Sequence, residues 1–251
     1  MSSAMRWWLP LLSSVVLVGG LSTGQLHAAP PQPCGMVYVV GGVGGLENLK
    51  LAVQVALRME GLRHEVIHFE WTHGKGKILK DLQDSRHYAQ KIEELANELQ
   101  RAQRANPTRP IYLIARSGGA GLALAAAERL PEGTLERIIL LSAAVSPQYD
   151  LRPALRAARN EIVSFYSDLD VVVLGWGTSQ FGTSDRHYCC SAGRVGFGKP
   201  DATEADSEEL YRRLVQVRWT PAMLLTGHTG GHTGTALPTF LAREVTPWLK
   251  P

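Results

Sequence analysis

Residues 109–121 read RPIYLIARSGGAG. The apolar run from Ile111 to Ala115 has the character of a buried β-strand, and a small, alanine-rich helical run begins directly behind Ser117. Ala115 and Gly119 flank that serine two residues away on each side. So abrupt a turn from strand to helix leaves no room for larger side chains at those two positions, and it exposes the serine at the end of a sheet. The pattern is typical of a nucleophile elbow.

Strand-like and helix-like segments alternate along the rest of the chain. The other expected strands are 36–40, 65–71, 137–142, 162–166 and 222–225, and the expected helices are 46–59, 84–105, 118–130, 152–159, 207–215 and 236–249. Such alternation predicts an α/β fold with a mostly parallel sheet and helices on both faces. A chain of 251 residues with 45% hydrophobic and 20% charged residues fits a single domain, which we expect over 30–251. The segment 171–204 is glycine-rich and long for a simple connection, so we expect a lid or a substrate-binding loop there.

Residues 1–29 have the features of a secretory signal peptide. Arg6 precedes an apolar run from Trp7 to Gly20, and the segment ends in small residues at Ala28 and Ala29. The run is short for a membrane span and contains Pro10, although an uncleaved anchor is the alternative interpretation. We therefore expect an exported protein, periplasmic or secreted, with no membrane contact beyond this segment.

Several classes of function are disfavoured by the sequence. The net charge is only +3, and no basic stripe with interleaved aromatics suggests nucleic-acid binding. The glycines after the first expected strand do not form a dinucleotide fingerprint, because Glu47 occupies the third required position. The three cysteines fit no zinc pattern. They allow either a disulfide from Cys34 to one of the adjacent pair Cys189 and Cys190, or three unpaired thiols.

An acid and a base follow the elbow in chain order. The strand 162–166 leads to two aspartates, of which Asp170 fits the acid position best and Asp168 is the alternative. His232 lies just before the last expected helix, in a loop that also contains the alternative base His228. The spacing of the two histidines could suggest a metal, but glycines interrupt the segment and no glutamate lies between them, so we expect no metal site.

Glycines after the first expected strand supply candidate backbone donors. An oxyanion is stabilised by N–H groups aimed at it. One donor should be Gly118, directly after the serine, and the other should come from the loop Gly41–Gly45, where Gly42 and Val43 are the candidates. Arg116 is unusual beside a nucleophile. We expect it to pair with a surface acid in preference to binding an anionic substrate.

Further polar residues fall near the expected carboxyl edge of the sheet, where open α/β sheets bind ligands. His68, Trp71 and His73 are candidates for lining a pocket or for packing. Residues 185–188 are candidates for contacting substrate if the irregular segment folds over Ser117. His64 and His87 are expected at the surface.

The elbow, the setting of Asp170, the Gly-Gly-His232 loop and the closing helix together resemble the α/β-hydrolase superfamily over residues 36–249, in particular its exported bacterial serine-hydrolase-like members. The resemblance implies hydrolysis of a carboxylic ester or related small acyl substrate through an acyl-enzyme, without a metal or organic cofactor. Ser117 would be the nucleophile, His232 the base and Asp170 the orienting acid. The alternative is a non-catalytic hydrolase-fold protein that binds a ligand or a cell-envelope partner.

Overall fold

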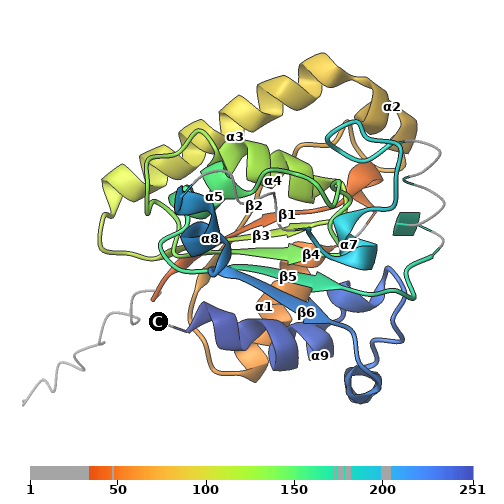
Figure 1. The fold of residues 1–251 in the computed structure, drawn as a ribbon. Coiled ribbons are helices and arrows are strands. Elements are labelled where there is room, and N and C mark those ends of the chain that lie inside the picture. Colours follow the sequence, from red (N-terminus) through yellow and green to blue (C-terminus); the bar gives the residue numbers. More distant parts are fainter. Residues whose placement is uncertain are drawn as a thin grey trace, which may run out of the picture. The chain divides into compact units, whose positions relative to one another are not determined.

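A parallel sheet of six strands forms the centre of this computed structural model (Figure 1). The strands are β1 (Met36–Val40), β2 (Glu65–His68), β3 (Ile111–Arg116), β4 (Arg137–Leu141), β5 (Ile162–Tyr166) and β6 (Leu214–Arg218). Their order across the sheet is β2-β1-β3-β4-β5-β6, and every neighbouring pair is parallel. The expected parallel α/β sheet is therefore confirmed.

The structure describes residues 34–46, 48–171, 173, 174, 178, 182–198 and 205–250. The expected signal peptide, Glu47 and part of the expected lid lie outside these residues. All described residues belong to one unit, Gln32–Pro251. Within them, no helix combines the length and apolar character needed to cross a membrane, and Cys34, Cys189 and Cys190 are free thiols.

Helices cover both faces of the sheet (Figure 1). One face packs against α3 (Ser85–Ala105), α4 (Gly119–Ala127), α5 (Arg152–Ala157) and α8 (Ala205–Tyr211). The other packs against α1 (Leu49–Met59), α9 (Pro238–Phe240) and the helical turns Leu241–Val245 and Thr246–Leu249. Alternation along β1 divides the two cores, since Tyr38 and Val40 face the first layer and Val37 and Val39 the second.

The helices follow from their sequences. Helix α3 buries one stripe, formed by Ile92, Leu95, Ala96 and Leu99, and leaves its other faces polar. By contrast, α4 is built from glycine, alanine and leucine and is buried on almost every side. A helix this apolar belongs in the interior, and its small residues let it lie close to the end of β3 and to the turn at Ser117.

The position of the sixth strand was predicted wrongly. The expected strand 222–225 belongs to a 3-10 helix at Pro221–Thr226. The expected helix 207–215 ends early, since α8 stops at Tyr211 and residues 214 and 215 belong to β6. Val215 and Val217 of β6 pair with β5, whereas Leu225 is 79% exposed. A short apolar run does not by itself distinguish strand from turn. Two smaller differences are that β2 ends at His68, and that a short helix α2 (Ile78–Gln83) was not expected.

Candidate active site

Ser117 occupies a strained turn at the carboxyl end of β3. Its φ angle is +52°, in the left-handed region that residues other than glycine rarely adopt. The turn is held by the neighbouring chain, because the Ser117 amide donates to Leu141 O (3.0 Å) and the Ala144 amide donates to Ser117 O (3.1 Å). Such strain persists only where surrounding structure compensates for it, and it is concentrated at functional positions.

Close packing explains the small residues around the serine. A methyl group added at Gly119 would lie 2.2 Å from Gly41 O, and one added at Gly118 would lie 2.7 Å from Val43 Cγ1. The elbow therefore lies directly against the loop that follows β1. Ala115 is fully buried within β3. The sequence pattern around Ser117 reflects this contact between two loops that are distant in the chain.

Ser117, His232 and Asp170 form a hydrogen-bonded chain. His232 Nδ1 lies 2.6 Å from Asp170 Oδ2, and its Nε2 lies 3.1 Å from Ser117 Oγ. An ionised carboxylate only accepts hydrogen bonds, so Nδ1 carries the proton and Nε2 is left to accept one from the serine hydroxyl. The carboxylate is buried, while the imidazole is 14% exposed and reaches solvent at its edge. This arrangement can remove a proton from Ser117.

The alternative acid and base lie elsewhere. Asp168 pairs with Arg218 on the surface. His228 is 2% exposed and stacks edge-on against Phe240, with ring centroids 4.8 Å apart, while its Nδ1 accepts from the Gly230 amide (3.1 Å). Burial lowers the pKa of His228 to about 4, although the nearby carboxylate of Asp170 raises it. His228 is therefore a neutral packing group under the loop that carries His232.

Arg116 was expected to pair with an acid at the surface, but it is buried beneath the loop that carries His232. It is 4% exposed, and its guanidinium donates to His232 O (2.6 Å) and to Thr235 Oγ1 (3.3 Å). Burial lowers the pKa of Arg116 to about 10, and the carboxylate of Asp170 opposes this shift. The side chain is thus still a cation at neutral pH. It connects the end of β3 to the loop of the base, a role that sequence spacing did not suggest.

The candidate oxyanion donors come together beside the serine. The amide nitrogen of Val43 would lie 3.8 Å from a methyl group placed on Gly118. Among the backbone hydrogen bonds that the described residues make outside helices and strands, none has Val43 or Gly118 as donor. Within the part of the chain that the structure describes, these two amides therefore suit a developing negative charge.

A segment of the expected lid crosses the same region. Ser184 Oγ donates to Gly118 O (3.0 Å), and Arg186 donates to Leu82 O (2.7 Å). Asp185 Oδ1 accepts from the Ser146 amide (2.9 Å). Ser184 and Arg186 border a cavity of about 20 Å³ beside Val43 and Gly118. This part of the segment is therefore bound to the body of the molecule.

His64, His73 and His87 have structural partners. His73 lies 2.9 Å from the buried carboxylate of Asp81, and His87 Nε2 donates to Trp71 O (2.7 Å). His64 Nε2 donates to Leu249 O (2.7 Å), and burial lowers its pKa. His64 and His87 are half-buried, so the expectation that they lie at the surface was wrong. No sequence pattern singled out Asp81.

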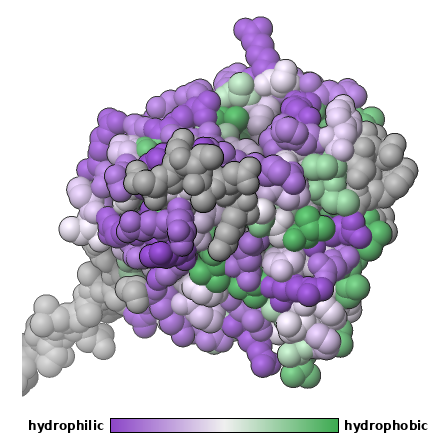
Figure 2. All heavy atoms as spheres, viewed as in Figure 1, coloured by the Kyte–Doolittle hydropathy of each residue, from purple (hydrophilic) through white to green (hydrophobic). Residues whose placement is uncertain are grey.

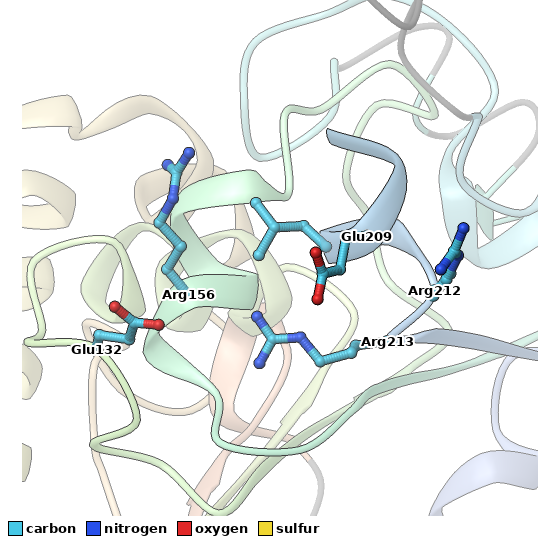
Figure 3. Close-up of a pocket in the computed structure, with 6 residues that line it drawn as sticks. Glu132, Arg156, Glu209, Arg212 and Arg213 are labelled. Carbon is cyan, nitrogen blue, oxygen red and sulfur yellow. The ribbon is translucent and has the colours of Figure 1, made fainter. Parts of the chain in front are cut away.

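A hollow larger than the cavity beside Gly118 lies at the opposite edge of the sheet. It measures about 670 Å³ and is lined by Glu132, Arg156, Glu209, Leu210, Arg212 and Arg213. Figure 3 shows these residues on α5, on α8 and in the turns before β4 and β6. The hollow thus lies at the amino ends of the strands and holds no nucleophile. Parallel α/β sheets bind ligands at the carboxyl ends, where Ser117 lies.

The surface differs between these two edges. Figure 2 shows hydrophobic residues gathered on the side toward which the strands point in Figure 1, whereas the opposite side is mainly hydrophilic. Exposed apolar side chains include Leu46, directly after the Gly41–Gly45 loop, and Leu169 and Val171 on either side of Asp170. Within the described residues, no group of three histidine, cysteine or acidic side chains could hold a metal ion.

The sequence matches a known family over most of its length. The model of the family Hydrolase_4, described as serine aminopeptidase, S33, matches residues 31–234. The chain belongs to this family. It is therefore an α/β hydrolase, as the resemblance implied. No curated protein sequence matches this hydrolase.

Solved structures with a similar arrangement are distant in sequence. TT1662 from Thermus thermophilus is 16% identical, with 88% of this chain and 89% of that chain covered and a TM-score of 0.49. Esterase PE8 is 20% identical, with 85% and 93% covered and a TM-score of 0.46. A predicted CIB-like hydrolase from Thermoplasma acidophilum is 13% identical, with 88% of each chain covered and a TM-score of 0.46.

Proposed function

We propose that this hydrolase cleaves carboxylic esters through an acyl-enzyme formed on Ser117. The observation that carries the proposal is the hydrogen-bonded chain from Ser117 Oγ through His232 to the buried carboxylate of Asp170. A serine hydroxyl is a weak nucleophile until a base lies within hydrogen-bond reach, and the base needs a third group to orient it.

The reaction proceeds in two halves. Ser117 Oγ attacks the carbonyl carbon while His232 Nε2 takes its proton, and the tetrahedral oxyanion is held by Gly118 and by the donors Gly42 or Val43. Collapse of this intermediate expels the alcohol, which takes the proton from His232. Water, deprotonated by the same imidazole, then attacks the acyl-enzyme and releases the acid. Asp170 stabilises the imidazolium in both halves.

The apolar rim favours an acyl substrate with a hydrocarbon portion. Leu46 directly follows the loop Gly41–Gly45, and Leu169 and Val171 directly flank Asp170 in sequence; all three side chains are exposed. Burying such groups against a hydrocarbon contributes about 25 cal/mol per Å². We further propose that residues 1–29 act as a signal peptide that directs export and that the protein hydrolyses its substrate after export.

A fluorophosphonate probe tests the proposal without knowledge of the natural substrate. It phosphonylates only an activated serine, so the wild-type protein should become labelled, Ser117→Ala should not, and His232→Ala should react far more slowly. The matched control is Ser142→Ala, because Ser142 also ends a strand with a positive φ (+48°) and is buried nearby. This variant should retain labelling.

A substrate panel then identifies the bond. p-Nitrophenyl esters should be hydrolysed, whereas aminoacyl p-nitroanilides test the peptidase activity named in the family description. Folded wild-type protein that is never labelled would overturn the proposal and favour the alternative, a ligand-binding protein on a hydrolase scaffold.

A further inference from the structure

The oxyanion loop Gly41–Gly45 is tied at two points to the segment between β2 and α3. Trp71 Nε1 donates to Gly41 O (2.8 Å) at the start of the loop. Toward its end, the Gly44 amide donates to Asp81 Oδ2 (2.7 Å), and the Gly76 amide donates to Gly44 O (2.7 Å). These contacts join residues more than 25 positions apart in sequence, so they exist only in the folded protein.

Asp81 is the buried centre of this network. Its side chain is fully inaccessible, and its other oxygen, Oδ1, accepts from the His73 amide (2.7 Å) and from His73 Nδ1 (2.9 Å). His73 is fixed in turn by stacking on His87, with ring centroids 4.0 Å apart. A buried carboxylate is costly unless it is fully hydrogen-bonded, and here the donors are supplied mostly by backbone amides.

The backbone of Gly44 is held in a conformation that favours glycine. Its φ angle is +80°, and a methyl group added to it would lie 2.6 Å from Ile78 Cγ1. Its amide donates to Asp81, its carbonyl accepts from the Gly76 amide, and the Ile78 side chain packs against its Cα.

The two anchors fix the peptide planes on either side of one amide. Trp71 holds the plane that contains the Gly41 carbonyl, and Asp81 holds the plane that contains the Gly44 amide. The peptide between these two planes carries the Val43 N–H, and the peptide bond is itself rigid. Fixing both neighbours therefore fixes the direction in which the Val43 amide points.

We infer that Asp81, together with Trp71, is a positioning residue that aims the Val43 amide at the oxyanion formed on Ser117. The inference rests on the proposed function and adds to it a group that never touches substrate. Preorganised donors stabilise charge without reorganising during the reaction, and loss of one donor costs about 10²–10³-fold in kcat. Loosening a donor should cost less, about 10–100-fold.

The test compares Asp81→Asn with Asp84→Asn. Asp81→Asn keeps the size and shape of the side chain but replaces one carboxylate oxygen by an NH₂ group. That group cannot accept from the donor it faces, so one of the hydrogen bonds around position 81 is lost. Asp84 is a partly exposed neighbour of this network: its Oδ2 lies 3.2 Å from His73 Nε2, and its Oδ1 accepts from the His87 amide. Among the described residues, no side-chain hydrogen bond joins Asp84 to the loop. Asparagine at position 84 can still accept from that amide.

The expected result is a drop of about 10–100-fold in kcat for Asp81→Asn on a p-nitrophenyl ester, with KM changed by less than about twofold. Fluorophosphonate labelling should slow by a similar factor. Asp84→Asn should remain within about twofold of the wild type. The variants are compared at equal folded fraction, measured by thermal unfolding.

A thionoester separates aiming from general damage. Sulfur is a weak hydrogen-bond acceptor, so an aimed donor favours the carbonyl ester over its thiono counterpart. The rate for the carbonyl ester divided by the rate for the thionoester should fall in Asp81→Asn. Damage to the fold would instead lower both rates equally and leave this ratio unchanged. Trp71→Phe, which removes the donor to Gly41 O without touching the carboxylate, should lower the ratio in the same direction and decides the matter if Asp81→Asn does not fold.

Two negative outcomes are distinguishable. Wild-type protein that the probe never labels would overturn the proposed function and this inference together. Wild-type protein that is labelled, alongside Asp81→Asn and Trp71→Phe with an unchanged oxo-to-thiono ratio, would overturn only the inference and leave Ser117 as the nucleophile.

Discussion

The two edges of the sheet differ in how their polar groups are held. At the carboxyl edge, Ser117 is 6% exposed and Asp170 and Arg116 are buried, and each is hydrogen-bonded to a segment distant in sequence. At the amino edge, Glu132 and Arg156 are exposed around a hollow more than ten times larger than the cavity beside Gly118 (about 670 against about 20 Å³). The larger hollow therefore lies at the edge opposite Ser117.

This contrast shows what marks a candidate site in this protein. Buried polar groups and strained backbone cost free energy, so they persist where other interactions offset that cost. Exposed charges around an open hollow cost little and carry little information. The four predictions below test this difference between the edges, from the largest expected effect to the smallest.

The acid should matter most. Asp170→Asn should lower kcat by about 10⁴-fold, because the amide would favour the wrong tautomer of His232. Steady-state hydrolysis of an activated ester measures the effect, and thermal unfolding checks that the variant is folded. Asp168→Asn is the matched control and should leave kcat within about twofold, since Asp168 is bound to Arg218 at the surface. Equal losses in the two variants would contradict the assignment of the acid.

The buried His228 should make stability depend on pH. Its pKa is about 4 in the folded protein and near 6.5 when unfolded, so the unfolded state binds the extra proton between these values. The stabilisation is complete above pH 6.5 and is lost as pH falls toward 4, by about 3 kcal/mol in total. Denaturant unfolding at pH 7.5 and 4.5 measures this loss. It should be smaller in His228→Gln, and an identical loss in that variant would contradict the prediction.

Arg116 and Arg213 provide a matched pair across the two edges. Both donate to backbone carbonyls, Arg116 to His232 O (2.6 Å) and Arg213 to Ala158 O (2.9 Å). Arg116→Met should lower kcat by about 10–100-fold by releasing the loop of the base, because a small misplacement of a catalytic group costs up to about 10²-fold. Arg213→Met should cost about 1 kcal/mol in stability and leave kcat within about twofold. Similar kinetics in both variants would remove the distinction between the edges.

The smallest effects should come from the exposed charges of the hollow. Arg156→Ala and Glu132→Ala should each change the free energy of unfolding by less than about 0.5 kcal/mol, with no effect on ester hydrolysis. A loss of activity in either variant would show that the hollow takes part in the function, and the contrast between the edges would then fail.

Much of the architecture could be predicted because it depends on local pattern. The first five strands and the long helix α3 follow from apolar periodicity, and the elbow follows from the requirement for small residues around Ser117. The failure at β6 has a physical cause. Val215 and Val217 form a strand because β5 offers an edge for pairing, and that edge exists only in the folded sheet.

The candidate site divides in the same way. Chain order and spacing selected Ser117, Asp170 and His232, and these three meet in the structure, while their catalytic role stays a prediction. Spacing did not reveal that Arg116 is buried or that Asp81 holds the oxyanion loop. Both depend on contacts between segments far apart in sequence, for which one sequence contains no periodic signal.

The sequence by itself determined the α/β class, the elbow at Ser117 and the order of serine, acid and histidine. Each rests on a local steric or hydrophobic rule that applies within a few residues. Only the tertiary structure brings Asp170, and not Asp168, to His232, and brings His232, and not His228, to Ser117. It alone buries Arg116 beneath the loop that carries His232. The physical reason is that hydrogen-bond distances and burial are set by the packing of the whole chain. Two residues that fit a sequence pattern equally well can therefore have different partners and different burial in the folded protein.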